Sequence, residues 1–180
     1  MDNGAGSYRR YLDGEEAAFD EILKEYFDKL VFFLSRYLPE RMEAEDVAMD
    51  VFAYLLIYPR RYDFFVSLKT YLFMLGKSRA LNRLRRLQRQ QQLSQGEGKT
   101  DTQPPEAWLL QKESHRQLHR AIAGLPQLQQ AAIHLVYFED LSCEEAARVL
   151  KKSRKQVYNL LYRAKEQLKT VLKEELDERF

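Results

Sequence analysis

The stretch LSCEEAARVLKKSRKQVYNLLYRAKEQL, residues 141–168, contains the clearest secondary-structure signals in this chain. Ser142 is a favourable helix N-cap and Glu145 is placed to complete a capping box, so a helix is predicted to begin at Cys143. A basic turn then leads to Ser153, a second N-cap candidate, and to another helix. The apolar residues of that helix share one face, formed by Val157, Leu160, Leu161, Ala164 and Leu168. A short helix, a tight turn and a longer helix are typical of a helix-turn-helix.

Positive charge is concentrated in the same stretch, although the whole chain carries a net charge of only +2. Residues 151–165 contain six bases and no acid. The side of the second helix opposite its apolar face suits the major groove of duplex DNA, with bases neutralising phosphates and other side chains approaching base edges. The predicted duplex-binding residues are Arg154, Lys155, Tyr158, Asn159, Tyr162 and Arg163. Two alternatives stay open: a helical hairpin with a solvated basic turn, or a protein partner that covers Tyr158 and Tyr162.

Length and composition narrow the class of protein. A chain of 180 residues suits one ordinary domain or two small ones, and 45% hydrophobic residues indicate a folded protein. Only 7 Gly and 5 Pro indicate few turns, so the predicted fold class is all-α. The single cysteine, Cys143, excludes an internal disulfide framework. We see no signal-peptide pattern, and the apolar run LVFFLS is too short to cross a bilayer, so we expect a cytoplasmic protein without membrane insertion.

A polar segment divides the chain in two. Residues 88–108 are rich in Gln, Gly, Ser, Thr and Pro and show no apolar period, so they bury too little surface to offset their ordering entropy. We therefore expect two small helical domains, residues 1–91 and residues 112–180, joined by a flexible linker at residues 92–111. The second domain would contain the helix-turn-helix.

Three helices are predicted in the first domain. Apolar residues recur at helical spacing in residues 13–38, and Pro39 ends that pattern. A second helix is predicted over residues 43–59, with Val47, Val51, Tyr54 and Leu55 buried. Its acids Glu43, Asp46 and Asp50 are expected to be exposed, and they would be either ordinary solvated surface or a docking face for a basic partner. The third helix is predicted to begin at the Ser67 cap.

The third predicted helix carries a second block of positive charge. Residues 64–96 contain seven bases and no acid. About three of five neighbouring aromatic residues are expected in the core; the five are Tyr62, Phe64, Phe65, Tyr71 and Phe73. An aromatic ring left exposed beside this charge would suit stacking on unpaired bases, whereas a basic face alone suits duplex phosphates. Two basic blocks favour nucleic acid as the ligand, although each block alone fits a solvated helix face equally well.

The order of these segments resembles a bacterial RNA polymerase sigma factor of the small, two-domain extracytoplasmic-function (ECF) group. Residues 44–56 resemble its polymerase-binding helix, and residues 67–86 resemble its promoter-melting helix. Residues 125–168 resemble its closing helix-turn-helix. The matching positions in the two amino-terminal motifs are Glu45, Asp46, Phe52, Tyr71, Ala80, Leu81, Asn82, Leu84, Arg85 and Arg86. Departures from the family's patterns are Met49, Asp50, Lys151, Tyr158 and Leu160.

The resemblance implies a promoter-specificity subunit with no catalytic site, cofactor or metal. In this family the carboxy-terminal domain reads the duplex promoter element at minus thirty-five, and the amino-terminal domain captures the melted strand near minus ten. Core RNA polymerase and promoter DNA are the implied partners, together with an anti-sigma factor of unknown identity. The implied polymerase-binding residues are Asp46, Asp50 and Phe52. For the melted strand we assign stacking to Tyr71, base contact to Asn82, and phosphate contacts to Arg79, Arg83, Arg85 and Arg86.

Two other kinds of protein are alternatives. A stand-alone helix-turn-helix regulator with an amino-terminal sensor or dimerisation domain explains residues 126–168 equally well, but it gives no reason for the second basic, aromatic helix. An enzyme is not favoured. The segment GEGKT lacks the first glycine of a phosphate-binding loop, and His115 with His119 lacks a third metal ligand.

Overall fold

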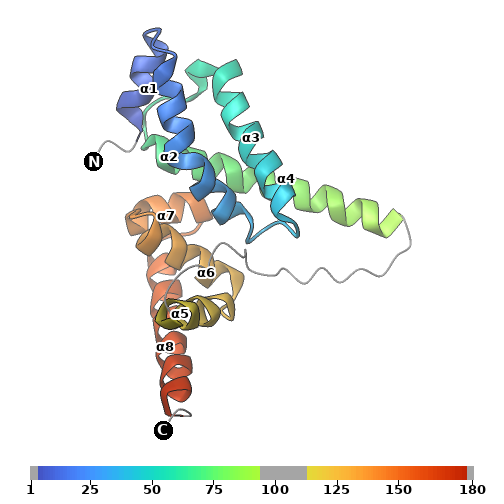
Figure 1. The fold of residues 1–180 in the computed structure, drawn as a ribbon, viewed down its shortest axis with the longest axis vertical. Coiled ribbons are helices and arrows are strands. Elements are labelled where there is room, and N and C mark those ends of the chain that lie inside the picture. Colours follow the sequence, from blue (N-terminus) through green and yellow to red (C-terminus); the bar gives the residue numbers. More distant parts are fainter. Residues whose placement is uncertain (1–3, 94–112, 178–180) are drawn as a thin grey trace. The chain divides into compact units, whose positions relative to one another are not determined.

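The computed structural model describes residues 4–93 and residues 113–177, and the chain divides into two compact units, residues 1–103 and residues 104–180. Both units consist of helices, with no strand among the residues described (Figure 1). The predicted all-α fold class is confirmed. The predicted linker at residues 92–111 lies outside the described residues except at its first two positions, and so does the GEGKT segment.

The described part of the amino-terminal unit contains four α-helices and one short 3-10 turn. In chain order they are α1 (Ala5–Leu12), α2 (Ala17–Leu34), α3 (Arg41–Ile57), η1 (Pro59–Arg61) and α4 (Leu68–Leu93). The three predicted helices are present, although α2 is shorter than the predicted span. The short helix α1 was not predicted. Its core anchor is Tyr8, whose buried hydroxyl donates a hydrogen bond to the Pro59 carbonyl over 2.9 Å.

Helix α4 is divided by its packing into a buried half and a projecting half. Its buried residues all lie between Leu68 and Ala80. In that half it approaches α2 closely, because a Cβ added at Gly76 would lie 2.9 Å from the Leu30 Cδ1 atom. The second half, which carries most of the arginines, extends past α3 (Figure 1). The core contacts of the first half therefore fix where the basic second half points.

The predicted start of α4 is confirmed by its hydrogen bonds. The Thr70 amide donates to the Ser67 hydroxyl over 3.1 Å, and the Tyr71 amide donates to the Ser67 carbonyl over 3.0 Å. Ser67 thus satisfies donors in the first turn that have no partner within the helix. This cap fixes the residue at which α4 begins.

Among residues 113–177, the carboxy-terminal unit has four α-helices and a π-helical turn. They are α5 (Glu113–Ala123), α6 (Gln127–Ile133), η3 (His134–Phe138), α7 (Cys143–Leu150) and α8 (Arg154–Asp177). Helices α6, α7 and α8 enclose a small core that includes Leu135, Val149 and Val157. The π-helical turn was not predicted from the sequence.

Both helix starts predicted in the helix-turn-helix are confirmed. The Glu145 amide donates to the Ser142 hydroxyl, and the Ser142 amide donates back to the Glu145 carboxylate over 2.9 Å, which completes the capping box. Ser153 and Gln156 form the same reciprocal pair at the start of α8, with bonds of 3.2 and 2.8 Å. These local hydrogen bonds fix the two ends of the turn.

The turn between α7 and α8 requires a left-handed backbone at Lys151. Its φ and ψ are 55° and 49°, and the following Lys152 amide donates to the Ala147 carbonyl over 3.0 Å. A left-handed conformation at the end of a helix is favourable for glycine and unfavourable for a residue with a Cβ atom. The turn is therefore strained by the side chain that occupies it.

We expect Lys151→Gly to stabilise the carboxy-terminal unit by about 1 kcal/mol, because glycine removes this backbone strain. Thermal unfolding followed by circular dichroism would report the gain as a higher midpoint temperature. Lys152→Gly is the matched control, since it loses the same charge at a position without a positive φ. Equal changes in the two variants would show that charge, rather than backbone strain, is responsible.

Candidate nucleic-acid interfaces

Helix α8 presents one continuous exposed face of the predicted kind. All six predicted duplex-binding residues are exposed, and Tyr162 retains 67% of its surface. The opposite side of the helix is held in the core by Val157, Leu161 and Ala164. The six residues share a face because they form three adjacent pairs spaced by one helical turn, at positions 154 and 155, 158 and 159, and 162 and 163. The structure therefore brings the predicted duplex-binding residues together.

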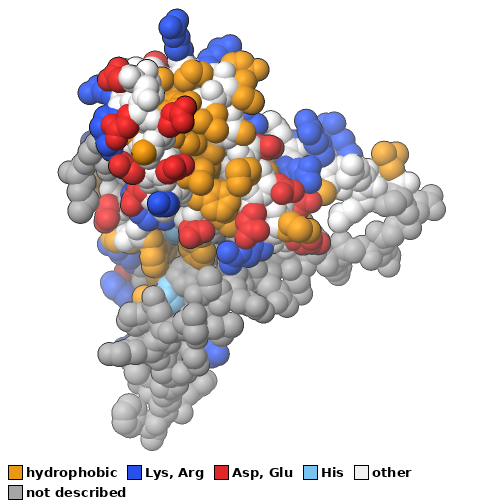
Figure 2. Space-filling model, turned by 45° about the horizontal axis from the view of Figure 1, so that its top comes forward, with side chains coloured by type: hydrophobic (Ala, Val, Ile, Leu, Met, Phe, Trp, Pro, Cys, Tyr) orange, Lys and Arg blue, Asp and Glu red, His pale blue; other side chains and the backbone are white. Residues whose placement is uncertain are grey.

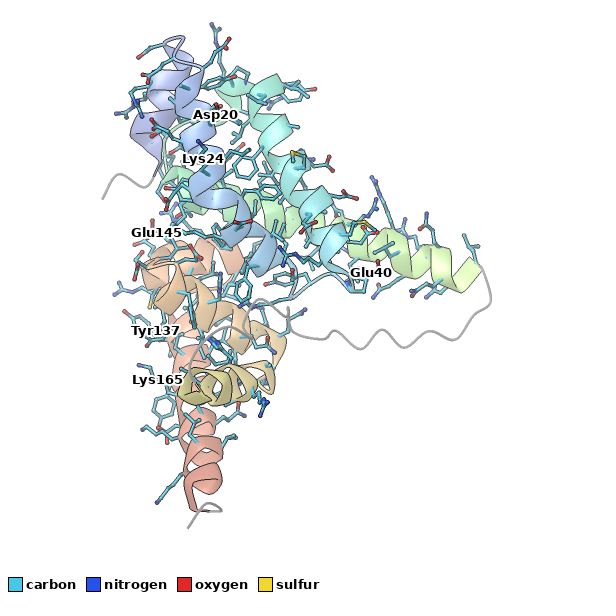
Figure 3. The ribbon with its side chains drawn as sticks, viewed as in Figure 1. Asp20, Lys24, Glu40, Tyr137, Glu145 and Lys165 are labelled. Atoms are coloured by element: carbon cyan, nitrogen blue, oxygen red, sulfur yellow. The ribbon has the colours of Figure 1, made fainter. Side chains whose placement is uncertain are left out.

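Two aromatic residues of this unit lie beneath cationic side chains. The Arg154 guanidinium lies 5.4 Å from the centre of the Tyr158 ring and donates a hydrogen bond to its hydroxyl over 3.2 Å. The Lys165 ammonium lies 5.1 Å from the centre of the Tyr137 ring (Figure 3). Such contacts orient long basic side chains that would otherwise lose more rotamer freedom on binding.

The projecting half of α4 forms a second basic surface. Asn82, Arg85 and Arg86 are exposed there, and the side-chain oxygen Oδ1 of Asn82 accepts a hydrogen bond from the Arg85 guanidinium over 3.1 Å. Arg79 is only partly exposed, and its guanidinium lies 4.9 Å from the centre of the Tyr54 ring. Tyr54 itself is partly exposed rather than buried as the sequence predicted.

Arg83 differs from the other arginines of α4 because it is ion-paired within the unit. Its guanidinium donates to the Glu43 carboxylate of α3, and that hydrogen bond is the main cause of the raised pKa of Arg83. Glu43 is therefore partly covered, although the sequence analysis expected it to be exposed. A phosphate contact by Arg83 stays a prediction, and it would compete with this ion pair.

The aromatic residues beside α4 are distributed differently from the expectation. Tyr62 and Phe73 are buried, Phe64 and Tyr71 are partly exposed, and Phe65 retains 77% of its surface. Two of the five are thus fully in the core rather than about three. Tyr71, which we assigned to stacking, packs against Tyr62 at a ring-centre distance of 5.2 Å, and burial raises its pKa. Phe65 is the most exposed of the five rings, and the sequence did not distinguish it from the other four.

Helix α3 presents a mixed acidic and apolar face. The predicted residues Asp46 and Asp50 are exposed on it. Phe52 is only 1% exposed, and its ring packs against Phe19 and Phe27 at centre distances of 6.4 and 6.0 Å. The ring therefore lies behind the acidic surface and holds α3 against α2. Burial gives no support to a direct contact between Phe52 and another molecule.

Exposed apolar residues on the same face were missed by the sequence analysis. Met42, Met49 and Leu56 are spaced by seven residues, so they lie nearly in line along the helix. Met49 retains 53% of its surface, and the other two are also exposed. Figure 2 shows acidic and apolar side chains beside one another on one face of this unit. We call Met42, Asp46, Met49, Asp50 and Leu56 the α3 face.

No group of three or more His, Cys, Asp or Glu side chains in the described part of the chain is arranged to hold a metal ion. Cys143 is a free thiol in the first turn of α7.

Across residues 4–93 and 113–177, no helix combines the length and the apolar character that a bilayer span requires.

Comparisons with known proteins point to one family for both units. The family models Sigma-70 region 2 and Sigma-70, region 4 match residues 22–90 and residues 115–168. The ECF RNA polymerase sigma factor RpoE of Cereibacter sphaeroides is 33% identical over 140 residues, which cover 74% of each chain. RNA polymerase sigma factor YlaC of Bacillus subtilis is 27% identical over 156 residues, covering 84% of this chain and 90% of YlaC.

A solved structure has the same fold. The sigma factor RpoE of Bartonella quintana, solved in complex with the anti-sigma factor NepR, aligns with a TM-score of 0.70 and 21% identity. The alignment covers 86% of this chain and 96% of that one.

Proposed function

Because this chain belongs to the ECF group of bacterial RNA polymerase sigma factors, we propose that its two basic surfaces hold promoter DNA in two different states, paired and unpaired. The chain is an alternative sigma factor that directs promoter recognition and transcription initiation, and it is not an enzyme. One observation carries the proposal: each of the two family matches contains one of the two basic surfaces, on α4 and on α8. A stand-alone regulator is not favoured, because it leaves the region 2 match unexplained.

The exposed face of α8 is proposed to read the duplex upstream element. Its amino-terminal turns would enter the major groove, where Asn pairs with adenine edges and Arg with guanine edges. Asn159 and Arg163 lie one turn apart on this face, so they would reach neighbouring bases. Arg154 and Lys155, at the start of the helix, would contact phosphates and set its register.

The basic half of α4 is proposed to hold the melted strand. Arg85 and Arg86 would contact the backbone, and Asn82 would contact a base. Phe65 lies just before the first turn of α4 and is exposed, so its ring is more accessible for stacking than the partly covered ring of Tyr71. Opening the duplex costs free energy, which is offset when extruded bases gain stacking and hydrogen bonds on the protein. The surface would thus favour the open promoter over the closed one.

The α3 face is proposed to bind core RNA polymerase. Its two carboxylates suit a basic partner surface, and its methionines and leucine supply apolar area with adaptable shape. Phe52 would support this face from the core. Arg83 and Glu43 tie α3 to α4, so the polymerase-binding helix and the strand-binding helix share one ion pair.

The remaining assignments are also proposals. Residues 1–91 would form the polymerase-binding and melting domain, residues 112–180 the upstream-reading domain, and residues 92–111 a flexible linker between them. The protein would act in the cytoplasm, where the transcribing polymerase works. The sigma factor RpoE of Bartonella quintana was solved with an anti-sigma factor, so we propose that a protein of that kind also holds this chain inactive.

The assignment of α8 is tested by Asn159→Ala and Arg163→Ala. Each variant is expected to lower run-off transcription from a cognate promoter about tenfold, because a bidentate base contact contributes about 1–3 kcal/mol of discrimination. Binding to core polymerase should not change. Lys169→Ala is the matched control, since Lys169 is an exposed base on the same helix that pairs with Glu166. An equal loss at promoters with unrelated upstream sequences would argue against base reading by this face.

A further inference from the structure

The segment that carries Phe65 has a backbone that needs support. Phe64 has a φ of 61°, which is uncommon for a residue with a bulky side chain. The next amide, that of Phe65, donates to the Asp63 carboxylate over 3.0 Å, and the Tyr62 hydroxyl donates to the Val66 carbonyl over 2.7 Å. A strained backbone of this kind persists where surrounding contacts determine it, and it is concentrated at functional sites.

Helix α1 supplies contacts at the start of this segment. Tyr8 is fully buried, and its hydroxyl lies 2.9 Å from the Pro59 carbonyl and 3.3 Å from the Leu55 carbonyl. Its ring meets the Tyr62 ring edge-on at a centre distance of 5.5 Å. Tyr8 thus joins α1 to the end of α3 and to the first residue of the strained segment.

A second contact reaches the strained residue itself. The Arg9 guanidinium lies 4.9 Å from the centre of the Phe64 ring, a cation–π distance, while the side chain of Arg9 remains exposed. The Phe64 ring also packs on Tyr62, with a centre distance of 4.6 Å. The neighbouring Arg10 instead pairs with Glu15 and Glu21. Two adjacent arginines of α1 therefore differ in that one contacts the segment and the other does not.

We propose that α1 is a positioning element for promoter opening: Arg9, acting through Phe64, and Tyr8 hold residues 62–66 in the conformation that presents Phe65 to unpaired nucleotides. The inference rests on the proposed role of Phe65 in stacking. If the segment already has its binding conformation before DNA arrives, less conformational entropy is lost when the segment binds the single strand. Arg9 itself needs no contact with DNA in this arrangement.

The test compares Arg9→Ala with Arg10→Ala in the full chain bound to core polymerase. A fluorescent single-stranded oligonucleotide with the melted promoter sequence serves as the probe, and its dissociation constant is the readout. Loss of an exposed cation–π contact is expected to weaken binding about threefold in Arg9→Ala. Arg10→Ala should bind like the unchanged chain, and both variants should retain their affinity for core polymerase. Equal affinities of the two variants for the strand would overturn the inference.

A direct phosphate contact by Arg9 predicts different results. If Arg9 acts through the Phe64 ring, Phe64→Leu removes the group that Arg9 contacts. Adding Arg9→Ala to that variant should then cause no further loss of affinity for the single strand. If Arg9 contacts a phosphate, the two losses should add, and the salt dependence of strand binding should fall by about one unit of slope in Arg9→Ala. Additive losses, or a smaller salt dependence in Arg9→Ala, would each overturn the positioning role.

Phe65→Ala separates this inference from its premise. If Phe65→Ala weakens strand binding while Arg9→Ala does not, stacking by Phe65 stands and only the role of α1 fails. If Phe65→Ala binds the strand as well as the unchanged chain, the proposed stacking fails and the role of α1 fails with it.

Discussion

The double variant Asp46→Lys, Asp50→Lys is expected to bind core RNA polymerase about 100-fold more weakly than the unchanged chain, because juxtaposed like charges cost several kcal/mol. Both carboxylates are exposed on the α3 face, beside apolar residues that would be covered by the partner. The substitutions lie on the surface of a helix held from the core side by Phe52 and Val51, so the fold should be retained. Affinity measured with labelled sigma factor and purified core polymerase would give the result directly.

Asp13→Lys, Asp20→Lys is the matched control for that measurement. Both residues are exposed acids of the same unit and lie outside the α3 face, and the change in net charge is identical. The control should bind core polymerase nearly as well as the unchanged chain, apart from a salt-dependent change in association rate. Equal weakening of both double variants would mean that the overall charge of the unit, rather than the α3 face, governs binding.

Local hydrogen-bond signals made the helix-turn-helix predictable from the sequence. Ser142 with Glu145 and Ser153 with Gln156 satisfy the first amides of α7 and α8 through side chains close in sequence, so no distant contact is needed to define either start. Once those starts are fixed, the helical period places Val157 and Leu161 in the core and the predicted DNA-binding residues on the opposite side.

The α3 face was harder to predict because α3 carries apolar residues on more than one side. The helical spacing of apolar residues does not by itself distinguish the buried Phe52 from the exposed Met49, since the two lie three residues apart in an apolar segment. The position of α2 decides between them. Phe19 and Phe27 of α2 receive the Phe52 ring, and Met49 is left facing away from that contact.

Helix α1 and the segment around Phe65 depend on tertiary contacts that have no local signature. An eight-residue helix is marginal by itself, so α1 relies on the burial of Tyr8 against α3 and residues 59–62. In the pair Phe64 and Phe65, the left-handed backbone at Phe64 turns one ring toward Arg9 and leaves the other exposed. Side-chain type is the same at both positions, and composition gives no means of choosing between them.

Phe65→Ala is expected to lower the occupancy of the open promoter complex about tenfold or more, because base stacking on an aromatic side chain contributes about 1–3 kcal/mol per base. The loss should appear in permanganate reactivity of unpaired thymines near minus ten. Recognition of the duplex upstream element by α8 and binding to core polymerase should be unchanged. The variant would therefore accumulate closed complexes at normal promoter occupancy.

Phe65→Leu and Phe65→Tyr separate stacking from simple apolar burial. Leucine keeps much of the apolar area without a ring face, so it should behave like alanine, whereas tyrosine keeps the ring and should open the promoter normally. A template with mismatched strands near minus ten requires no melting, so transcription from it should be much less sensitive to Phe65→Ala. If leucine supports opening as well as tyrosine does, the contribution of Phe65 comes from apolar area, and a ring stacked on an unpaired base is not the source of the open state's stability.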